Sequence, residues 1–398
     1  MSAEAVNRAK EHFGKLIEEQ LARVNKMKTA PDWTDYSKLK TIKIGLAGGD
    51  GIGPIICDQT RRVVEYLLKD EVKQGKIEFV NITGLTIENR YEQMKAVPED
   101  VLEQIKKCHV FLKGPTETPK SGDPRGELES ANVSLRRSLD LFANVRPVKV
   151  PEMNIDWTFF RENTEGEYVL GSKGINVTED LAVDFKVTTT QGSERIIRAA
   201  FEYAKKKGVN TVTVVTKANV VKTTDGKFSA IAQKMQKEYP GIKADEWYID
   251  IMAAKLIDPA RRSDFKVFVL PNLYGDIITD EAAQIQGGVG TAGSANIGRQ
   301  YAMFEAIHGS GTRMVEEGRA QYADPCSMIK AAVLMMEHVG FPKRAKALDM
   351  ALDLCTAEKK LVCTGHKSGA TAEQFTNYLV ETITDPQLEA RWKALSKA

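Results

Sequence analysis

The stretch FKVFVLPNLYGDIITDEAAQIQ, residues 265–286, contains a strand-like run followed directly by a helix-like run. Its first part is short and almost continuously apolar, which is typical of a strand. Its second part carries apolar residues at the spacing of an amphipathic helix. A strand that leads into a helix is the repeating unit of α/β proteins with a largely parallel sheet.

The same order recurs along most of the chain. KIGLAGG (43–49) precedes CDQTRRVVEYLLKDEV (57–72), and VNTVTVVTK (209–217) precedes DGKFSAIAQKMQKEY (225–239). We therefore predict an α/β architecture with helices flanking the sheet. The stretch GINVTEDLAVDFKVTTT (174–190) departs from this order, because its many Thr and Val residues favour a small antiparallel element. We expect it to form an inserted arm.

The bulk composition narrows the class of protein. With 398 residues the chain is long enough for two lobes, and its net charge of +2 indicates neither a nucleic-acid nor a membrane partner. The five cysteines form no CxxC pair, which predicts reduced thiols in a cytoplasmic protein. We find neither a signal peptide nor an apolar run of about 18 residues, so we expect a soluble protein.

The N-terminal stretch MSAEAVNRAKEHFGKLIEEQLARVNKMK predicts an amphipathic helix. Its apolar residues recur at helical spacing: Val6, Ala9, Phe13, Leu16, Ile17, Leu21 and Val24. This apolar face could pack on the same chain or contact another subunit.

The chain contains two glycine-rich stretches, and the first invites comparison with a dinucleotide-binding motif. GGDGIGP (48–54) fails the G-x-G-x-x-G fingerprint, because Pro54 and Ile56 occupy the positions that need a small residue. We interpret it as a tight turn from strand to helix and predict that the fold is not a Rossmann fold. GGVGTAGSANIG (287–298) is either a flexible connection or a place where backbone approaches a ligand.

Two aspartates in the opening stretch could bind a divalent cation. Asp276 and Asp280 lie four residues apart, and a helix that begins near Asp276 would bring both to one face. Carboxylate oxygens favour Mg²⁺ or Mn²⁺. The alternative is that Asp276 caps the helix while Asp280 is solvated. Asp250, in the apolar context WYIDIM, also needs a partner.

ESANVSLRRSLDLFANVRP (129–147) carries Arg136, Arg137 and Arg146 without an acidic cluster to neutralise them. Ser130 lies near the expected start of a helix, where free N–H groups attract anions. Asn132 and Arg136 share a helix face, and guanidinium groups bind carboxylates with paired hydrogen bonds. We expect Arg137 to point away towards a surface acid.

Several of these stretches, in this order, resemble the β-decarboxylating dehydrogenases that act on isocitrate, isopropylmalate, homoisocitrate and tartrate. The matching stretches extend from about residue 43 to 380 and are GGDGIGP, LKGP, NVSLRRSLDLFANVRPV, FRENTEGEY, TKANVVK, NLYGDIITDEAA, GSANIG and FEAIHGS. Among the members of this family, the chain is most similar to those that oxidise isocitrate.

The resemblance implies an isopropylmalate dehydrogenase-like α/β fold, non-Rossmann, in which two lobes share a mixed sheet. The expected domains are a large α/β domain on the cofactor side at 1–141 and 301–398 (with an N-terminal helix extension at 1–40), a small α/β domain at 142–165 and 211–300, and an inserted dimer arm at 166–210.

The activity implied is metal-dependent oxidative decarboxylation of isocitrate to 2-oxoglutarate, with hydride transfer to NAD(P)⁺. By the same resemblance, the substrate-binding residues are Thr118, Ser130, Asn132, Arg136, Arg146 and Arg161. Isopropylmalate enzymes carry apolar residues where this chain has Ser130 and Asn132, so a third carboxylate is expected to bind there. Homoisocitrate or 3-isopropylmalate dehydrogenase is the alternative within the family, and a non-catalytic regulatory subunit of a hetero-oligomer is the alternative of another class.

The family also implies the catalytic roles. Asp250, Asp276 and Asp280 match its metal ligands for Mg²⁺ or Mn²⁺, with one of them supplied by a partner subunit. Lys217, also lent across the dimer, would assist removal of the hydroxyl proton, and Tyr168 would protonate the enolate left after CO₂ departs. Shared sites imply a homodimer.

The cofactor-binding residues that the family implies are Lys113, Thr118, His308, Gly309, Ser310, Gly311, Thr312, Arg313, Asp324, His366 and Lys367. Members that use NAD⁺ typically carry aspartate at the position of Arg313. A cation there suits the 2′-phosphate of NADP⁺, and His366 and Lys367 agree with it. Met314 and Asp324 depart from the pattern of NADP⁺ users, so the resemblance favours NADP⁺ and leaves NAD⁺ open. Glu117 stands where the family usually has threonine.

Overall fold

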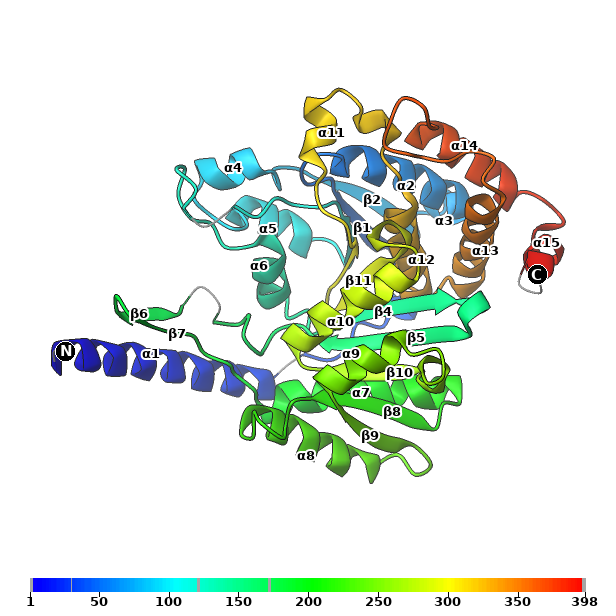
Figure 1. Ribbon diagram of the computed structural model, residues 1–398. Helices are drawn as coiled ribbons and strands as arrows, with labels where there is room; N and C mark the ends of the chain where they lie inside the picture. The colour runs from blue at the N-terminus through cyan, green and yellow to red at the C-terminus, as the bar shows by residue number, and fades with distance from the viewer. Residues whose placement is uncertain (1–2, 30, 120–121, 171–172, 396–398) are drawn as a thin grey trace. The chain divides into compact units, whose positions relative to one another are not determined.

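The computed structural model describes residues 3–29, 31–119, 122–170 and 173–395, which divide into two compact units (Figure 1). Unit 1 comprises Met1–Trp33, Phe142–Val145 and Met153–Ala282. Unit 2 comprises Thr34–Leu141, Arg146–Glu152 and Ala283–Ala398. Strand β4 (Ala143–Val150) is divided between them.

Unit 1 is built on a parallel sheet in the order β5-β10-β8-β9. Its strands are β5 (Ile155–Glu162), β10 (Val267–Leu270), β8 (Thr211–Thr216) and β9 (Lys243–Tyr248). The helices around this sheet are α7 (Thr190–Lys207), α8 (Thr224–Gln236), α9 (Ile249–Ile257) and most of α10 (Asn272–Ile285). A 3₁₀ turn occurs at Arg262–Asp264. Helix α7 packs against β5, β8 and β10. The predicted alternation of strands and helices is therefore confirmed in this unit.

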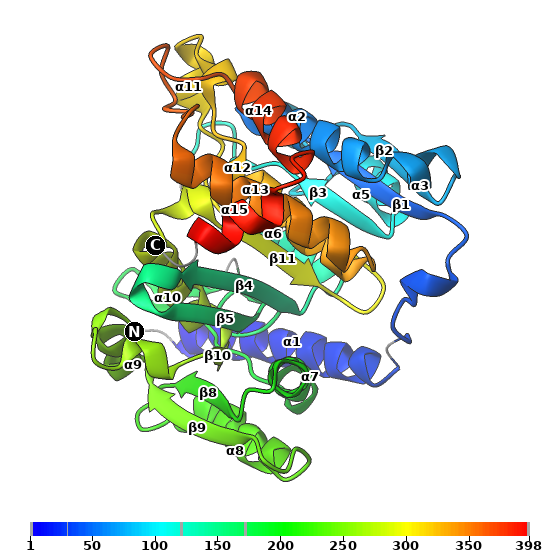
Figure 2. The ribbon, with the colours of Figure 1, turned by 90° about the vertical axis from the view of Figure 1, so that its right-hand side faces the viewer.

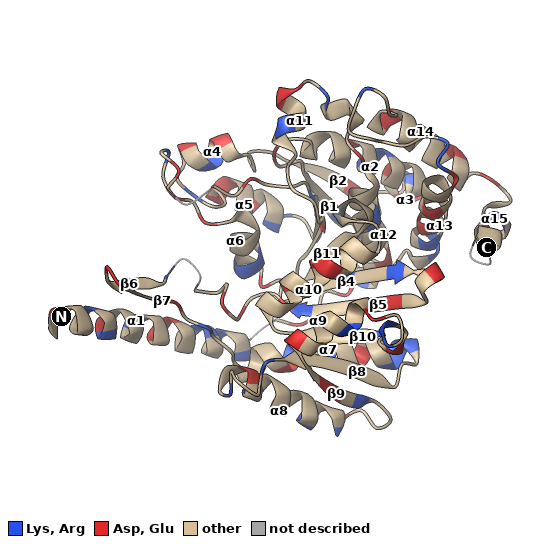
Figure 3. Ribbon diagram, viewed as in Figure 1, with Lys and Arg blue, Asp and Glu red and all other residues tan. Residues whose placement is uncertain are grey.

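Unit 1 also contains the predicted arm and the predicted N-terminal helix. Strands β6 (Ile175–Thr178) and β7 (Leu181–Val183) pair antiparallel, as their composition indicates; residues 171–172 of the expected arm lie outside the described residues. Helix α1 (Ala3–Lys28) lies beside β6 and buries Leu16 (Figure 1). Charged residues of both signs are interspersed along it (Figure 3). The helix thus packs on its own chain, and a further contact with another subunit stays a prediction.

Unit 2 contains a mixed sheet in the order β2-β1-β3-β12-β11, in which β11 and β12 are antiparallel and the other neighbours parallel. The strands are β1 (Ile42–Ala47), β2 (Ile77–Ile82), β3 (Val110–Lys113), β11 (Gly293–Ile297) and β12 (Ala302–Ala306). Its α-helices are α2 (Gly53–Leu67), α3 (Lys69–Lys73), α4 (Ile87–Glu92), α5 (Glu99–Lys106), α6 (Ala131–Ser138), α11 (Thr312–Glu316), α12 (Cys326–His338), α13 (Pro342–Glu358), α14 (Ala372–Ile383) and α15 (Leu388–Leu395). Short 3₁₀ turns occur at Tyr36–Lys38, Pro151–Met153, Val289–Thr291 and Ala320–Tyr322.

The C-terminal helices pack on one another and on the sheet of unit 2. Helix α12 contacts β11, β12, α2 and α13, and α13 in turn contacts α14 and α15 (Figure 2). From Cys326 onward, the described chain is therefore mostly helical. In the described part of the chain, no helix combines the length and the apolar character that a membrane span requires.

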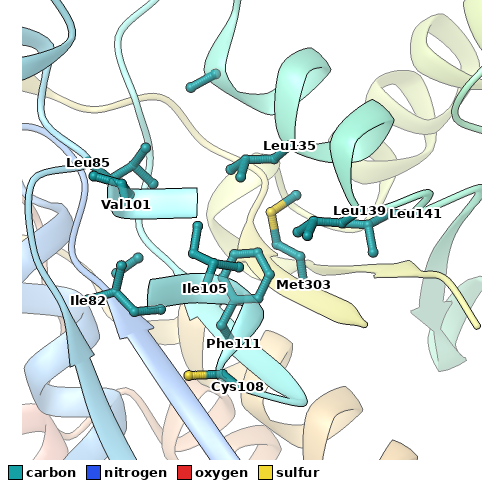
Figure 4. Close-up of a cluster of buried hydrophobic side chains, with 12 residues drawn as sticks. Ile82, Leu85, Val101, Ile105, Cys108, Phe111, Leu135, Leu139, Leu141 and Met303 are labelled. Carbon is teal, nitrogen blue, oxygen red and sulfur yellow. The ribbon is translucent and has the colours of Figure 1, made fainter. Parts of the chain in front are cut away.

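Helix α6 is held by an apolar cluster of unit 2 (Figure 4). Its residues Ala131 and Leu135 are fully buried there, together with Val101, Ile105 and Phe111. Because a buried cluster of this kind is closely packed, it fixes the position of the helix. The side chains on its other face, including Asn132 and Arg136, are therefore presented from a rigid element.

The compact units differ from the predicted domains at three places, residues 1–33, 146–152 and 283–300. Helix α1 groups with unit 1, although we expected it to extend the large domain, because its buried face contacts the arm. Residues 283–300 group with unit 2 because β11 pairs with β12 and packs against α12. The arm itself belongs to unit 1.

Candidate active site

In unit 2, Arg136 is anchored by a buried carboxylate that the sequence did not reveal. Its Nη2 atom lies 3.2 Å from Glu305 Oε1, which also accepts a hydrogen bond of 2.8 Å from Asn296 Nδ2. The other oxygen of Glu305 lies 3.3 Å from Lys113 Nζ, which is fully buried. Burial opposes ionisation of Glu305, but Lys113 and Arg136 outweigh it and lower the pKa of the carboxyl to about 2.

Glu305 does not use all of the hydrogen-bonding capacity of Arg136. Within the described residues, the buried Nε atom of Arg136 has no hydrogen-bond partner. Two cations face one carboxylate here, which leaves local positive charge at α6. A buried donor and an excess of positive charge together favour an anionic ligand.

The start of α6 places the predicted polar residues beside Arg136. Ser130 is the N-cap residue, and in the described chain its side chain makes no capping hydrogen bond. Asn132 lies one turn before Arg136 on the same helix face, and its Oδ1 atom is 3.5 Å from Thr116 Oγ1. Thr118 is exposed in the loop that follows β3. Arg146 is buried on β4, in the part of that strand that belongs to unit 2.

Two of the arginines predicted to bind substrate have acidic partners from distant parts of the chain. Arg136 pairs with Glu305 and Arg161 pairs with Asp276, and both acids lie more than a hundred residues away in the sequence. Such partners form no acidic cluster that can be recognised locally. Arg137 makes two hydrogen bonds of 2.8 and 2.7 Å to Glu129, which confirms that it points to a surface acid.

The turn GGDGIGP lies between two of the predicted ligand-binding loops of unit 2. Asp50 N donates to Pro115 O at 2.8 Å, and Ile52 N donates to Ser310 O at 2.9 Å. Gly51 has a φ of +60°, and a Cβ atom there would lie 2.0 Å from Ser310 O. The predicted tight turn is confirmed, and its glycines permit close approach to the protein's own backbone.

Asp50 and Arg90 hold the loop that precedes α6. The Asp50 carboxylate accepts hydrogen bonds of 2.7 Å from Ile87 N and Glu117 N, and burial raises its pKa. Arg90, which is fully buried, donates to the carbonyls of Glu117 and Glu129. Neither residue was recognised from the sequence, because each acts on backbone that is distant along the chain.

The predicted cofactor residues other than Lys113 and Thr118 lie on α11 and on the segments next to it in unit 2. Arg319 Nη1 donates to Gly365 O at 2.5 Å and Gly365 N donates to Tyr322 O at 3.2 Å, so the loop with His366 and Lys367 is fastened to the segment after α11. Arg313 is 83% exposed and pairs with Glu317. The carboxylate of Asp324 accepts a hydrogen bond from Cys326 N at the start of α12. The stretch from His308 to Thr312 joins β12 to α11.

In unit 1, a second polar cluster joins Arg161, Tyr168, Asn272 and Asp276. Tyr168 Oη donates to Asp276 Oδ2 at 2.7 Å, and Arg161 forms an ion pair with the other oxygen of Asp276. Asn272 Oδ1 accepts from Arg161 Nε at 3.0 Å and from Nη2 at 2.7 Å. Burial, and next the bond to Asp276, raise the pKa of Tyr168 to about 12, so the phenol stays protonated at neutral pH.

Lys217 and Asp250 form a separate ion pair in unit 1. Lys217 Nζ lies 2.6 Å from Asp250 Oδ1, and the Asp250 side chain is 58% exposed. Lys217 directly follows β8, where Asp225 Oδ2 accepts a 2.8 Å hydrogen bond from its backbone N–H. The hydrogen bond from Lys217 lowers the pKa of Asp250.

The three predicted metal ligands lie on two helices. Asp276 and Asp280 are on one face of α10, as predicted, but α10 begins at Asn272, so the alternative in which Asp276 caps the helix is wrong. Asp250 is in the first turn of α9. In the part of the chain that the structure describes, no three His, Cys, Asp or Glu residues gather as a metal-binding group. The oxygen donors suit Mg²⁺ or Mn²⁺, and the metal site stays a prediction.

Comparisons with known proteins agree with these features. Residues 43–381 match the family model described as isocitrate/isopropylmalate dehydrogenase. The NADP-named isocitrate dehydrogenase of Rickettsia prowazekii is 38% identical over 75% of this chain, and the match spans 59% of that relative's length. Subunit 2 of the mitochondrial NAD-named isocitrate dehydrogenase of Schizosaccharomyces pombe is 35% identical over 78% of this chain and 79% of its own. Homoisocitrate and 3-isopropylmalate dehydrogenases also match.

A solved structure extends the agreement to the fold. Isocitrate dehydrogenase from Methylococcus capsulatus superimposes with a TM-score of 0.74 at 33% identity, covering 87% of this chain and all of that one. The predicted isopropylmalate dehydrogenase-like fold is confirmed. Since the family model covers all but the two ends of the chain, this protein belongs to the isocitrate/isopropylmalate dehydrogenase family.

Proposed function

We propose that the protein catalyses the oxidative decarboxylation of isocitrate to 2-oxoglutarate and CO₂, with hydride transfer to NADP⁺ in preference to NAD⁺. The observation that carries this proposal is the face of α6 on which Asn132 lies one turn before the buried Arg136. An amide and a guanidinium there suit a carboxylate substituent, whereas an isopropyl group would require an apolar surface.

The arginines account for binding of the remaining carboxylates. In the proposal, Arg136, Arg146 and Arg161 bind the malate-like part of the substrate. Glu305 holds Arg136 and Asn272 holds Arg161, so each guanidinium is oriented before substrate arrives. Preorientation of this kind lowers the entropic cost of binding and alignment.

Proton transfer is assigned to Lys217 and Tyr168. In the proposal, Lys217 assists removal of the proton of the 2-hydroxyl as the C2 hydrogen leaves as hydride for the nicotinamide. Loss of CO₂ then leaves an enolate, and Tyr168 donates its phenolic proton to the carbon. The hydrogen bond of 2.7 Å from Tyr168 Oη to Asp276 supports this assignment, because it holds the phenol beside a proposed metal ligand.

A divalent cation and a second subunit complete the proposal. Asp250, Asp276 and Asp280 would hold Mg²⁺ or Mn²⁺, which when bound polarises the hydroxyl and carboxylate oxygens of the substrate. Within the described residues, the three aspartates do not gather as one metal-binding group, which supports a site to which a second copy of the chain lends Lys217 and Asp250. The proposed assembly is therefore a homodimer with shared sites.

Two alternatives make different predictions. Homoisocitrate or 3-isopropylmalate dehydrogenase would turn over its own substrate faster than isocitrate. A non-catalytic regulatory subunit would bind isocitrate without turnover. The retention of Tyr168, Lys217, Asp250, Asp276 and Asp280 supports catalysis by this chain.

Substitution of Asn132 tests the proposed function. Formation of the reduced nicotinamide is followed by its absorbance at 340 nm, with Mg²⁺ or Mn²⁺ and with isocitrate, homoisocitrate or 3-isopropylmalate as substrate. We expect isocitrate to be the preferred substrate and Asn132→Leu to lower its kcat/KM by roughly 10- to 100-fold, because a hydrogen bond to a charged group is lost. Activity with 3-isopropylmalate should not fall in parallel.

Arg137→Leu provides the matched control, because Arg137 is on the same helix but pairs with Glu129 at the surface. Its kcat/KM should stay within about twofold of the wild type. An unchanged kcat/KM in Asn132→Leu would refute the assignment, as would faster turnover of another acid by the wild-type protein.

A further inference from the structure

Helix α1 lies outside the matched region, residues 43–381, yet it packs on the segment that carries Tyr168. Leu16 is buried against Val169 and Leu170, which directly follow Tyr168. Phe13 stacks on Phe185 with ring centroids 5.5 Å apart. The helix is thus an addition to the family fold that touches a predicted catalytic segment.

One side chain of α1 reaches a buried carboxylate of that segment. Arg23 Nη2 lies 2.7 Å from Glu165 Oε1; Glu165 is 3% exposed and Arg23 is 20% exposed. Glu165 also accepts hydrogen bonds from Thr189 N at 2.8 Å and Thr189 Oγ1 at 2.5 Å. A Cβ atom at Gly192 would lie 2.3 Å from this carboxyl group, so the glycine makes room for it.

The backbone of Glu165 continues the connection to a predicted substrate ligand. Its carbonyl accepts a 3.0 Å hydrogen bond from Asn272 Nδ2. The oxygen of the same amide accepts from Arg161 Nε and Nη2, at 3.0 and 2.7 Å. Two side chains, Glu165 and Asn272, therefore separate Arg23 from Arg161.

The connection from α1 to Arg161 depends on the ion pair between Arg23 and Glu165. Glu162 and Glu165 are both buried in the same segment; Arg195 on α7 acts on Glu162, and Arg23 pairs with Glu165. Without Arg23, the buried carboxylate of Glu165 would lose this ion pair. Leaving a carboxylate buried without its cation is costly, so the segment must rearrange to solvate it.

We propose that Arg23 is a positioning residue of the active site, which fixes segment 162–168 through Glu165 and thereby orients Arg161 and Tyr168. Its effect on catalysis rests on the proposed function, whereas its effect on the segment does not. The two are therefore tested by separate measurements on the full-length protein.

The first measurement is kinetic and uses Arg23→Ala, Arg23→Lys and the control Arg8→Ala. Arg8 is also on α1 and donates to the carbonyls of Asn176 and Val177, away from segment 162–168. We expect Arg23→Ala to lower kcat/KM for isocitrate about tenfold, because small misplacements of binding groups are costly. Arg23→Lys should recover most of the loss, and Arg8→Ala should stay within about twofold of the wild type.

The second measurement is hydrogen–deuterium exchange of the peptide covering 162–170, without substrate. Arg23→Ala should accelerate its exchange, while Arg8→Ala should not. Should Arg23→Ala fail to fold, Arg23→Gln keeps the aliphatic stem and a polar end group and removes the charge. Equal exchange and kinetics in the Arg23 and Arg8 variants would overturn the proposal. A wild-type protein inactive on isocitrate would refute the proposed function alone, because exchange still reports on Arg23.

Discussion

Glu305 partly neutralises the buried positive charge of Lys113 and Arg136. Lys113 and Arg136 are both buried and both lie within ion-pair distance of this one carboxylate. The cluster has more cations than anions, so a substrate carboxylate would complete its charge balance. The same carboxylate keeps Arg136 in place while the site is empty.

This arrangement predicts a pH-dependent contribution to stability. The pKa of Glu305 is lowered to about 2, against an ordinary value near 4.5. Its contribution is therefore fully present above about pH 4.5 and is lost as the pH falls towards 2. Glu305→Gln leaves two buried cations without an anion, and we expect it to cost about 3–5 kcal/mol at pH 7.

Urea unfolding at several pH values measures this effect. The difference in unfolding free energy between wild type and Glu305→Gln should narrow as the pH falls from about 4.5 towards 2, because the wild-type carboxylate becomes protonated. Glu129→Gln is the control, since Glu129 pairs with Arg137 at the surface and should cost less than about 1 kcal/mol. A difference that is independent of pH would show that Glu305 is not the anion of the pair.

Arg313 is the residue at which cofactor choice is tested. It is exposed at α11, next to the loop of His366 and Lys367, and could approach a 2′-phosphate. We expect Arg313→Asp to move the ratio of kcat/KM for NADP⁺ over NAD⁺ at least about tenfold towards NAD⁺. Arg313→Lys, which keeps the charge, should change it less. Undiminished use of NADP⁺ by Arg313→Asp would mean that the phosphate is bound elsewhere.

At the scale of elements, local sequence patterns predicted where individual helices and strands form. The apolar spacing after residue 270 predicted α10, and Asp276 and Asp280 share one of its faces. The Thr- and Val-rich stretch predicted the pairing of β6 and β7. These features depend on neighbours within a few residues, which a sequence displays directly.

Partners that meet only in the folded chain were not predictable in this way. The acids opposite Arg136 and Arg161, and the amide of Asn272 between Arg161 and Glu165, come from distant strands and helices. Which strand ends meet depends on strand order, and the strand order β5-β10-β8 follows from tertiary packing rather than from local periodicity. The residues that hold the predicted ligands in place were therefore not predictable from local sequence patterns.

At the scale of the whole molecule, α1 and the arm give unit 1 a surface that a second copy of the chain could contact. Apolar side chains stay exposed on both, namely Val6, Phe13, Ile17 and Leu21 on α1 and Leu181 and Val183 on β7. A second copy of the chain is the partner that the proposed function requires. Whether its site is shared between copies can be decided by pairing two defective chains.

The paired chains carry Tyr168→Phe and Lys217→Ala, are co-expressed with different tags, and are purified as the mixed dimer. In a shared site, one of the two sites of this dimer combines an intact Tyr168 with an intact Lys217 from the other chain, so about half of the wild-type activity should return. Each variant alone should be inactive. The control pairs Tyr168→Phe with Arg161→Ala; because both residues contact Asp276 of their own chain, neither site of that dimer is intact and activity should stay lost. If Lys217 acted within its own chain, the first pair would be as inactive as the control, since every site would then lack one of the two groups.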